Sequence, residues 1–393
     1  NNEYISEIER KIKMKSYKTQ FARISDAFIG VTAVIMAVTL VASGIAVSKI
    51  NTEYCSFMPE ISLPQKVFFG DGAARKFAQS YYENILILSD AETVKQTESL
   101  GYIQDMLGEK TPDIKLLVSK DFNELYEKSI KYISEKAPDR IVAVGSAWLM
   151  DAAMFISYQS GVGFAAVPYF SSCSMTDFPE ADYNIYCLSP VEVVLDPDLA
   201  MQITSGTIAY DAMSCFAYAA DAVISCDNDV IASLALSSAA SIINHAVGAY
   251  RGNYKSIARL QYAMYCAVLA YRNSTKCGSL MLDELTSFFA KLGIKKQTAA
   301  AICVPDYLEH NRCDALGELA RRVGLFRSGE DISFSVDRII ERIRRIQASL
   351  NIPRSINAIC SDAELYSAFC ENTHLPSELL DTCFYGNFKF MKL

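Results

Sequence analysis

The stretch DRIVAVGSAWLMDAAM (residues 139–154) decides the fold. The four apolar residues Ile141–Val144 predict a short buried strand. Gly145 and Ser146 predict a tight turn, and a helix is predicted to follow. Such a strand–turn–helix brings free backbone N–H groups and the positive end of a helix dipole to one point, which is how many α/β proteins hold a phosphate. Trp148, the only tryptophan, stands where that turn is normally open.

Short apolar runs alternate with helical patterns on both sides of this stretch. The strands are expected at Lys66–Gly70, Asn84–Leu88, Lys115–Val118, Ile141–Val144, Gly163–Pro168 and Val191–Leu195. This alternation predicts a parallel sheet with helices on both faces, over residues 63–198. Ligands bind such sheets at the carboxyl ends of the strands, so the turns after Val144 and Val167 are the expected binding region.

Strand patterns stop after Leu195, and residues 199–393 predict a helical domain. The helices are expected at Ile203–Cys226, Val230–Tyr250, Ser256–Asn273, Leu282–Leu292, Ala315–Val323 and Ser335–Leu350. The chain is therefore expected to join an α/β nucleotide-binding-type domain to an all-α domain.

The N-terminal part has a different character. Residues 1–26 are polar, residues 27–48 carry no charge, and residues 49–62 form a connector. A helix over the uncharged run spans roughly 33 Å, enough to cross a hydrocarbon core, so a transmembrane helix is predicted. The alternative is a buried helix of a soluble core, because the run is rich in Ala, Gly, Ser and Thr.

Two signals disagree on membrane orientation. The Lys and Arg residues of the first 26 positions favour a cytoplasmic N-terminal flank, which would place the large domain outside. Twelve cysteines without a CxxC pair indicate free thiols in a reducing compartment. We expect a membrane-associated protein with its large domain in the cytoplasm, where the helix joins a protein partner or a membrane complex.

Composition excludes some function classes. The net charge of −8, without a basic patch, argues against nucleic-acid binding. Only three histidines occur, His245, His310 and His374, which limits any histidine-rich metal site.

Seven stretches, in order, carry a resemblance to a known family. They are PQKVFFGDGA, DRIVAVG with MDAAM, GFAAVP, VEVVLDPDLA, IAYDAMSCFAYAADAV, SLALSSAASIINHAVGAYRGN and CVPDYLEHN. Together they resemble the iron-containing (group III) alcohol dehydrogenases, which share their fold with glycerol dehydrogenases and dehydroquinate synthase. The resemblance implies a dehydroquinate synthase-like fold, an active site between the two domains, and a homo-oligomer.

The NAD(P)-binding motifs of that family are altered here. The family's Gly-Gly-Gly-Ser turn matches Gly145, Ser146, Ala147 and Trp148, so an indole replaces a serine hydroxyl beside the phosphate path. Asp151 matches an aspartate of the pattern, whereas Met154 replaces a lysine. In the second cofactor loop, the resemblance implies contacts from Tyr169 and Ser172, but both glycines of the family motif are serines.

The implied metal site is altered further. The family uses one aspartate and three histidines, and the resemblance places these ligands at Asp211, Cys215, Leu282 and Lys296. A further histidine that relays a proton falls on Thr286. Only Asp211 keeps its identity, so iron or zinc is not expected, and NAD(P) stays open as a cofactor.

Two interpretations of the site follow. The first is a catalytically degenerate relative that acts as a scaffold or binding subunit. The second is an active NAD(P)H-dependent reductase of a small aldehyde or ketone, in which Lys296 or Tyr169 polarises the carbonyl group. For Asp211 and Cys215, the default interpretation is a polar group on a helix face and a buried thiol. A soft-metal half-site of these two residues, completed by Asp283 or Glu284, is one alternative. An ion pair of Lys296 with Asp211 at the former metal position is another.

Overall fold

The computed structural model describes residues 63–80, 82–170, 189–226, 228–274, 281–370 and 373–386. All of them belong to one compact unit, Glu60–Leu393. The polar segment 1–26, the predicted membrane span at 27–48 and the connector 49–62 lie outside the described residues.

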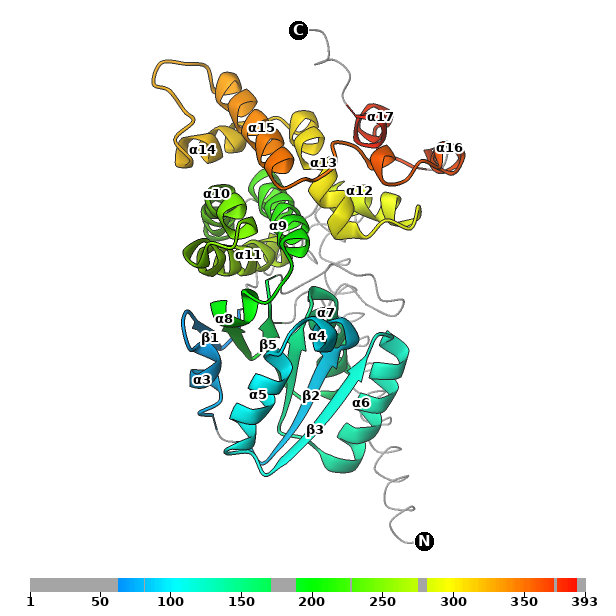
Figure 1. The fold of residues 1–393 in the computed structure, drawn as a ribbon. Helices are drawn as coiled ribbons and strands as arrows, with labels where there is room; N and C mark the ends of the chain where they lie inside the picture. The colour runs from blue at the N-terminus through cyan, green and yellow to red at the C-terminus, as the bar shows by residue number, and fades with distance from the viewer. Residues whose placement is uncertain are drawn as a thin grey trace, which may run out of the picture. The chain divides into compact units, whose positions relative to one another are not determined.

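A six-stranded parallel sheet forms the first part of this unit (Figure 1). Its strands are β1 (Lys66–Phe69), β2 (Asn84–Asp90), β3 (Asp113–Ser119), β4 (Arg140–Gly145), β5 (Phe164–Pro168) and β6 (Glu192–Leu195). Their order is β1-β6-β5-β4-β2-β3, and every neighbouring pair is parallel. The predicted parallel sheet is confirmed. The chain leaves β2 toward β3 on one side and returns to β4 on the other, so a crevice is expected at the carboxyl ends of β2 and β4.

Helices cover both faces of the sheet. They are α3 (Ala73–Phe77), α4 (Ala91–Gln96), α5 (Ser99–Gly108), α6 (Phe122–Lys136) and α7 (Ala147–Ser160). Side chains of a strand point alternately to opposite faces. Ile85 and Ile87 of β2 therefore pack in one core with residues of α3 and α5, while Leu86 and Leu88 pack in a second core with residues of α6 and α7.

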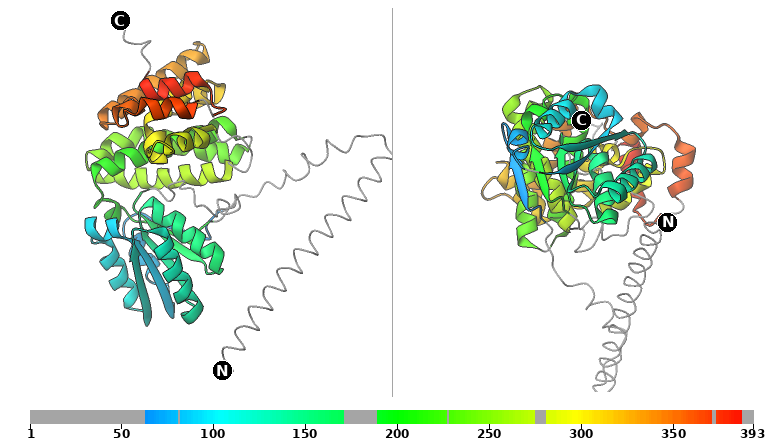
Figure 2. Two further views of the ribbon diagram at one scale, coloured as in Figure 1. Left: turned by 90° about the vertical axis from the view of Figure 1, so that its right-hand side faces the viewer. Right: turned by 90° about the horizontal axis from the view of Figure 1, so that it is seen from below.

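Every described element after β6 is helical. These elements are α8 (Pro197–Ala200), α9 (Ser205–Ser225), α10 (Asp229–Tyr250), α11 (Tyr254–Ser274), α12 (Met281–Ala290), α13 (Lys296–His310), α14 (Asp314–Arg322), α15 (Ile332–Ser349), the 3-10 helix η4 (Ile356–Ala358), α16 (Ala363–Cys370) and α17 (Ser377–Tyr385). Figure 2 shows most of them stacked in layers beyond one end of the α/β part.

Among the described helices, α10 is long and apolar enough to cross a membrane. Its Ala239 and Ile242 are fully buried in the same core as residues of α9 and α11. Since core helices of soluble proteins share this length and composition, α10 is only weak evidence of a membrane protein.

Polar contacts fix the helical part against the sheet. The Gln261 side-chain amide of α11 donates a hydrogen bond to the Tyr169 carbonyl oxygen at 2.8 Å. Arg272, also on α11, forms a buried ion pair with Asp151 of α7, with 3.2 Å between Nη2 and Oδ1. The Asp151 carboxylate therefore joins the two parts of the fold, and its contact with a cofactor stays a prediction.

Candidate functional site

A cleft of about 880 Å³ lies between the carboxyl ends of the strands and the helical part. Its α/β wall is formed by Asp90, Ala91, Glu92, Thr93, Lys120, Gly145, Ser146, Ala147, Trp148, Tyr169 and Phe170. Its helical wall is formed by Ile203, Gly206, Thr207, Tyr210, Asp211, Ala290, Ile294, Lys295, Lys296, Gln297 and Thr298. The turns after Val144 and Val167 thus meet at this cleft, as predicted, together with Asp211 and Lys296.

The turn from β4 into α7 already holds an internal carboxylate. Asp90, at the end of β2, accepts a hydrogen bond from the backbone N–H of Ser146 at 3.0 Å. The same carboxylate caps α4, because it accepts hydrogen bonds from the backbone N–H and the hydroxyl group of Thr93, both at 2.8 Å. An anion bound at this turn would therefore face a fixed negative charge.

Gly145 is required for this arrangement. Its φ is +153°, and a Cβ atom there would lie 2.4 Å from Oδ2 of Asp90 and 2.7 Å from Oγ1 of Thr93. The sequence singled out Gly145 but not Asp90 as part of the site. The signal that could have found it was an aspartate directly after a buried strand, at the edge where parallel strands end.

Two aromatic side chains, Trp148 and Tyr169, line the α/β wall of the cleft. Trp148 is partly buried and packs against the core on the α7 face of the sheet while lining the cleft. Tyr169 is buried, and its hydroxyl group lies 2.8 Å from that of Thr97. Burial raises the pKa of Tyr169, and hydrogen bonds from the hydroxyl groups beside it lower this pKa. Ser172 lies outside the described residues.

Asp211 projects from the N-terminal part of α9, a helix capped by the hydroxyl group of Thr204. It lines the cleft next to the loop that leads into α13. Burial raises the pKa of Asp211 to about 7, and the Lys295 ammonium group acts in the opposite direction. The carboxyl group therefore changes its charge near neutral pH.

Lys296 pairs with a different acid from the one expected. Its ammonium nitrogen lies 3.0 Å from Oδ1 of Asp283, and the Lys296 and Asp283 side chains are 7% and 28% exposed. The predicted ion pair with Asp211 is therefore wrong. Asp283 precedes Lys296 by only 13 residues, and it lies in the first turn of the adjacent helix α12. Lys296 therefore pairs with the carboxylate that lies near it in the sequence, on the adjacent helix of the α12–α13 hairpin.

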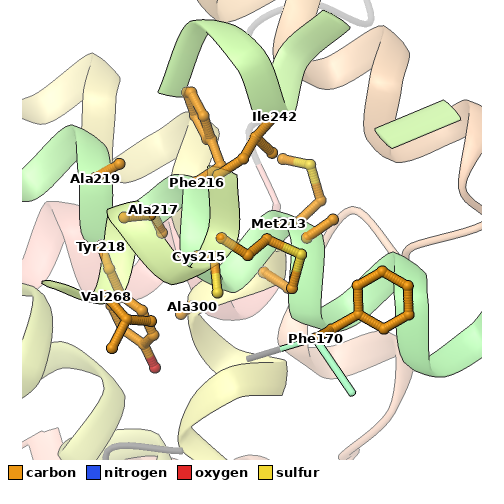
Figure 3. Packing of buried hydrophobic residues seen from close by; sticks show 14 of the residues in the cluster. Phe170, Met213, Cys215, Phe216, Ala217, Tyr218, Ala219, Ile242, Val268 and Ala300 are labelled. Atoms are coloured by element: carbon orange, nitrogen blue, oxygen red, sulfur yellow. The ribbon is translucent and has the colours of Figure 1, made fainter. Parts of the chain in front are cut away.

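The other residues that match metal ligands lie in the core. Cys215 is fully buried between α9, α11 and α13, close to Val268 and Ala300 (Figure 3). Leu282 is fully buried as well, and it offers no donor atom. Thr286 is buried and donates its hydroxyl hydrogen bond to the Asp283 carbonyl oxygen at 3.1 Å.

These side chains do not fit a metal ion. In the part of the chain that the structure describes, no three His, Cys, Asp or Glu residues are grouped so that they could hold one. The half-site of Asp211 and Cys215 completed by Asp283 or Glu284 is therefore not found, because Cys215 packs in the core and Asp283 pairs with Lys296. Zinc and iron sites need a set of N, O or S donors, and here one position holds an ammonium group.

Several solved structures share this architecture. An alcohol dehydrogenase from Oenococcus oeni is 17% identical, with a TM-score of 0.69 over 80% of this chain and 92% of its own. An iron-containing alcohol dehydrogenase from Thermococcus thioreducens is 16% identical, with a TM-score of 0.67 over 83% of this chain and 100% of its own. A sulfoacetaldehyde reductase from Bifidobacterium kashiwanohense, solved with NAD+, is 14% identical, with a TM-score of 0.66 over 84% of this chain and 94% of its own. No protein-family model and no curated protein matches the sequence.

Proposed function

We propose, from the premise that this chain has the fold of the iron-containing alcohol dehydrogenases, that it is a catalytically degenerate relative acting as a scaffold or binding subunit. The Lys296–Asp283 ion pair is the observation that carries this proposal. Hydride transfer to a carbonyl group needs the substrate held beside a Lewis acid or a strong hydrogen-bond donor. At the positions that would hold the Lewis acid, this chain has a buried thiol, a leucine and a paired ammonium group.

The cofactor side of the cleft supports the same proposal. The Asp90 carboxylate already accepts the Ser146 backbone N–H that a cofactor phosphate would use. Trp148 adds apolar surface next to this turn. The cleft itself keeps its volume, about 880 Å³. A pocket of this size suits a small-molecule ligand, so binding without turnover is the role that we assign to it.

Two assays on the full chain test the proposal. In the first, NADH or NADPH is mixed with a panel of short aldehydes and ketones, with and without added Zn²⁺ or Fe²⁺. In the second, fluorescence of Trp148 is followed during nucleotide titration, because the only tryptophan lines the cleft. We expect no oxidation of the nicotinamide under any condition. Turnover that requires the cleft, and is therefore abolished by Gly145→Trp, would contradict the proposal.

The second candidate is a metal-independent reductase. Asp211 favours it, because a carboxyl group with a pKa of about 7 can donate a proton in the cleft at neutral pH. Lys296 lines the same cleft, whereas the Tyr169 hydroxyl group is already engaged with Thr97. This candidate predicts turnover that survives chelators and is lost in Asp211→Asn. A catalytically degenerate protein, in contrast, shows no turnover either as the wild type or as Asp211→Asn.

We also propose that residues 27–48 tether the chain to a membrane, where it meets a protein partner, with the large domain in the cytoplasm and assembled as a homo-oligomer. The uncharged run of the sequence supports the tether. Flotation of the full chain with lipid vesicles, compared with a chain that lacks residues 1–48, tests it. The full chain is expected to float and the shortened chain to stay in the soluble fraction, where light scattering measures its oligomeric state.

A further inference from the structure

The ion pair between α12 and α13 lies where the resemblance places a metal ligand. Lys296 is the first residue of α13, and Asp283 lies in the first turn of α12. The Lys296 side chain is only 7% exposed although it lines the cleft. A lysine held so deeply is normally paired, and the 3.0 Å contact with Asp283 provides the partner.

Two helices that pack against α13 each carry a carboxyl group, Asp211 on α9 and Asp283 on α12. Asp211 lies on the same wall of the cleft, where α9 packs against α13. On the α12 side, Thr286 bonds to the backbone of Asp283. A divalent cation bound by Asp211 would share this cleft with the Lys296 ammonium group, and like charges near each other are unfavourable in a partly buried site.

We infer that the Lys296 ammonium group is the resident cation of this fold: it replaces the metal ion, and its pairing with Asp283 holds the α12–α13 wall of the cleft without one. The inference goes beyond the proposed function, because it concerns what orders the cleft wall. It stands whether or not the cleft proves catalytic.

Metal content tests the exclusion of a cation. The full chain is loaded anaerobically with Zn²⁺ or Fe²⁺, desalted, and its metal counted per chain. We expect no stoichiometric metal in the wild type. The triple variant Cys215→His, Leu282→His, Lys296→His, with the native Asp211, is expected to bind one ion per chain, because it recreates three imidazoles and a carboxylate.

The matched control retains the ammonium group. Cys215→His with Leu282→His restores two imidazoles but keeps Lys296, and it is expected to stay free of metal. One ion per chain in the wild type, or in this double variant, would overturn the inference. The same holds if a folded triple variant binds no metal.

Variants of the Lys296–Asp283 pair test whether this pair stabilises the α12–α13 wall of the cleft. They place no larger side chain at the buried Cys215 position, so they test the inference even if the triple variant does not fold. Removing one partner of a buried pair is more harmful than removing both. Lys296→Met is therefore expected to lower Tm by about 2 °C or more, and Lys296→Met with Asp283→Leu is expected to recover at least half of that loss. The control Lys291→Met changes an exposed lysine that follows α12 and is expected to leave Tm unchanged. A double variant as unstable as the single one, or a stable Lys296→Met, would overturn the inference.

Discussion

The Gln347 side chain replaces a backbone hydrogen bond that a proline removes from helix α13. Pro305 lies inside α13 and has no N–H group, so the carbonyl oxygen of Ala301, four residues earlier, loses its helical donor. The Gln347 side chain of α15 donates instead, to the Ala301 oxygen at 2.6 Å and to the Ile302 oxygen at 3.1 Å. Gln347 and Ala301 are 4% and 0% exposed, so water cannot take its place.

Gln347→Met keeps the volume of the side chain but removes both hydrogen bonds. The Ala301 carbonyl oxygen is then buried without a donor, which costs about 1–3 kcal/mol of unfolding free energy. Equilibrium unfolding in urea, followed by circular dichroism, measures this loss.

A second substitution isolates the reason for it. Pro305→Ala restores the backbone N–H that Ala301 lacks, so in that background Gln347→Met is expected to cost less than about 1 kcal/mol. Equal losses in the two backgrounds would show that Gln347 does not compensate for the N–H group missing at Pro305. A loss below about 0.5 kcal/mol from Gln347→Met alone would lead to the same conclusion.

Three further predictions concern the cleft and its supports. Arg272→Met leaves the buried Asp151 without this partner and should lower the unfolding free energy in urea by about 3–5 kcal/mol. Adding Asp151→Leu should recover most of this loss. An equal loss in the single and the double variant would argue against a stabilising pair. Gly145→Ala brings a Cβ atom within 2.4 Å of Asp90 and should lower the unfolding free energy by more than about 1 kcal/mol; an unchanged Tm would contradict the described turn. The pKa of Asp211 is raised to about 7 from an ordinary value of 3.8, so its contribution to stability is complete below about pH 4 and is lost as pH rises through 7. Asp211→Asn should therefore match the wild type at pH 4 and exceed its unfolding free energy by about 4 kcal/mol at pH 8, since each pKa unit corresponds to about 1.4 kcal/mol; a variant less stable at pH 8 would contradict this sign.

The sheet could be predicted because each strand carries its own signal. Runs such as Ile85–Leu88 and Ile141–Val144 are continuously apolar, as strands buried on both faces must be, and polar or small residues end them. The capping role of Asp90 was also visible locally. Its hydrogen bond with Ser146 joins residues 56 positions apart, and it depends on β2 and β4 being neighbours in the sheet.

In the helical part, one helix and the partners of two charged residues could not be predicted from the sequence. Helix α13 was not predicted, because Pro305 argues against a continuous helix and the compensating donor, Gln347, comes from another helix. Asp151 and Lys296 were recognised as charged residues with a role, but their partners Arg272 and Asp283 are set by helix packing and by the α12–α13 hairpin. Residue type predicts that a buried charge needs a partner, and only the packed fold says which one.

A crystal structure of the full chain grown with Zn²⁺, with anomalous scattering recorded at the zinc edge, shows whether the cleft holds a metal ion or the Lys296 ammonium group. We expect no anomalous peak beside Asp211 and a Lys296 ammonium group within hydrogen-bond distance of Asp283. A zinc ion coordinated by Asp211, with the Lys296 side chain turned away from Asp283, would contradict this expectation.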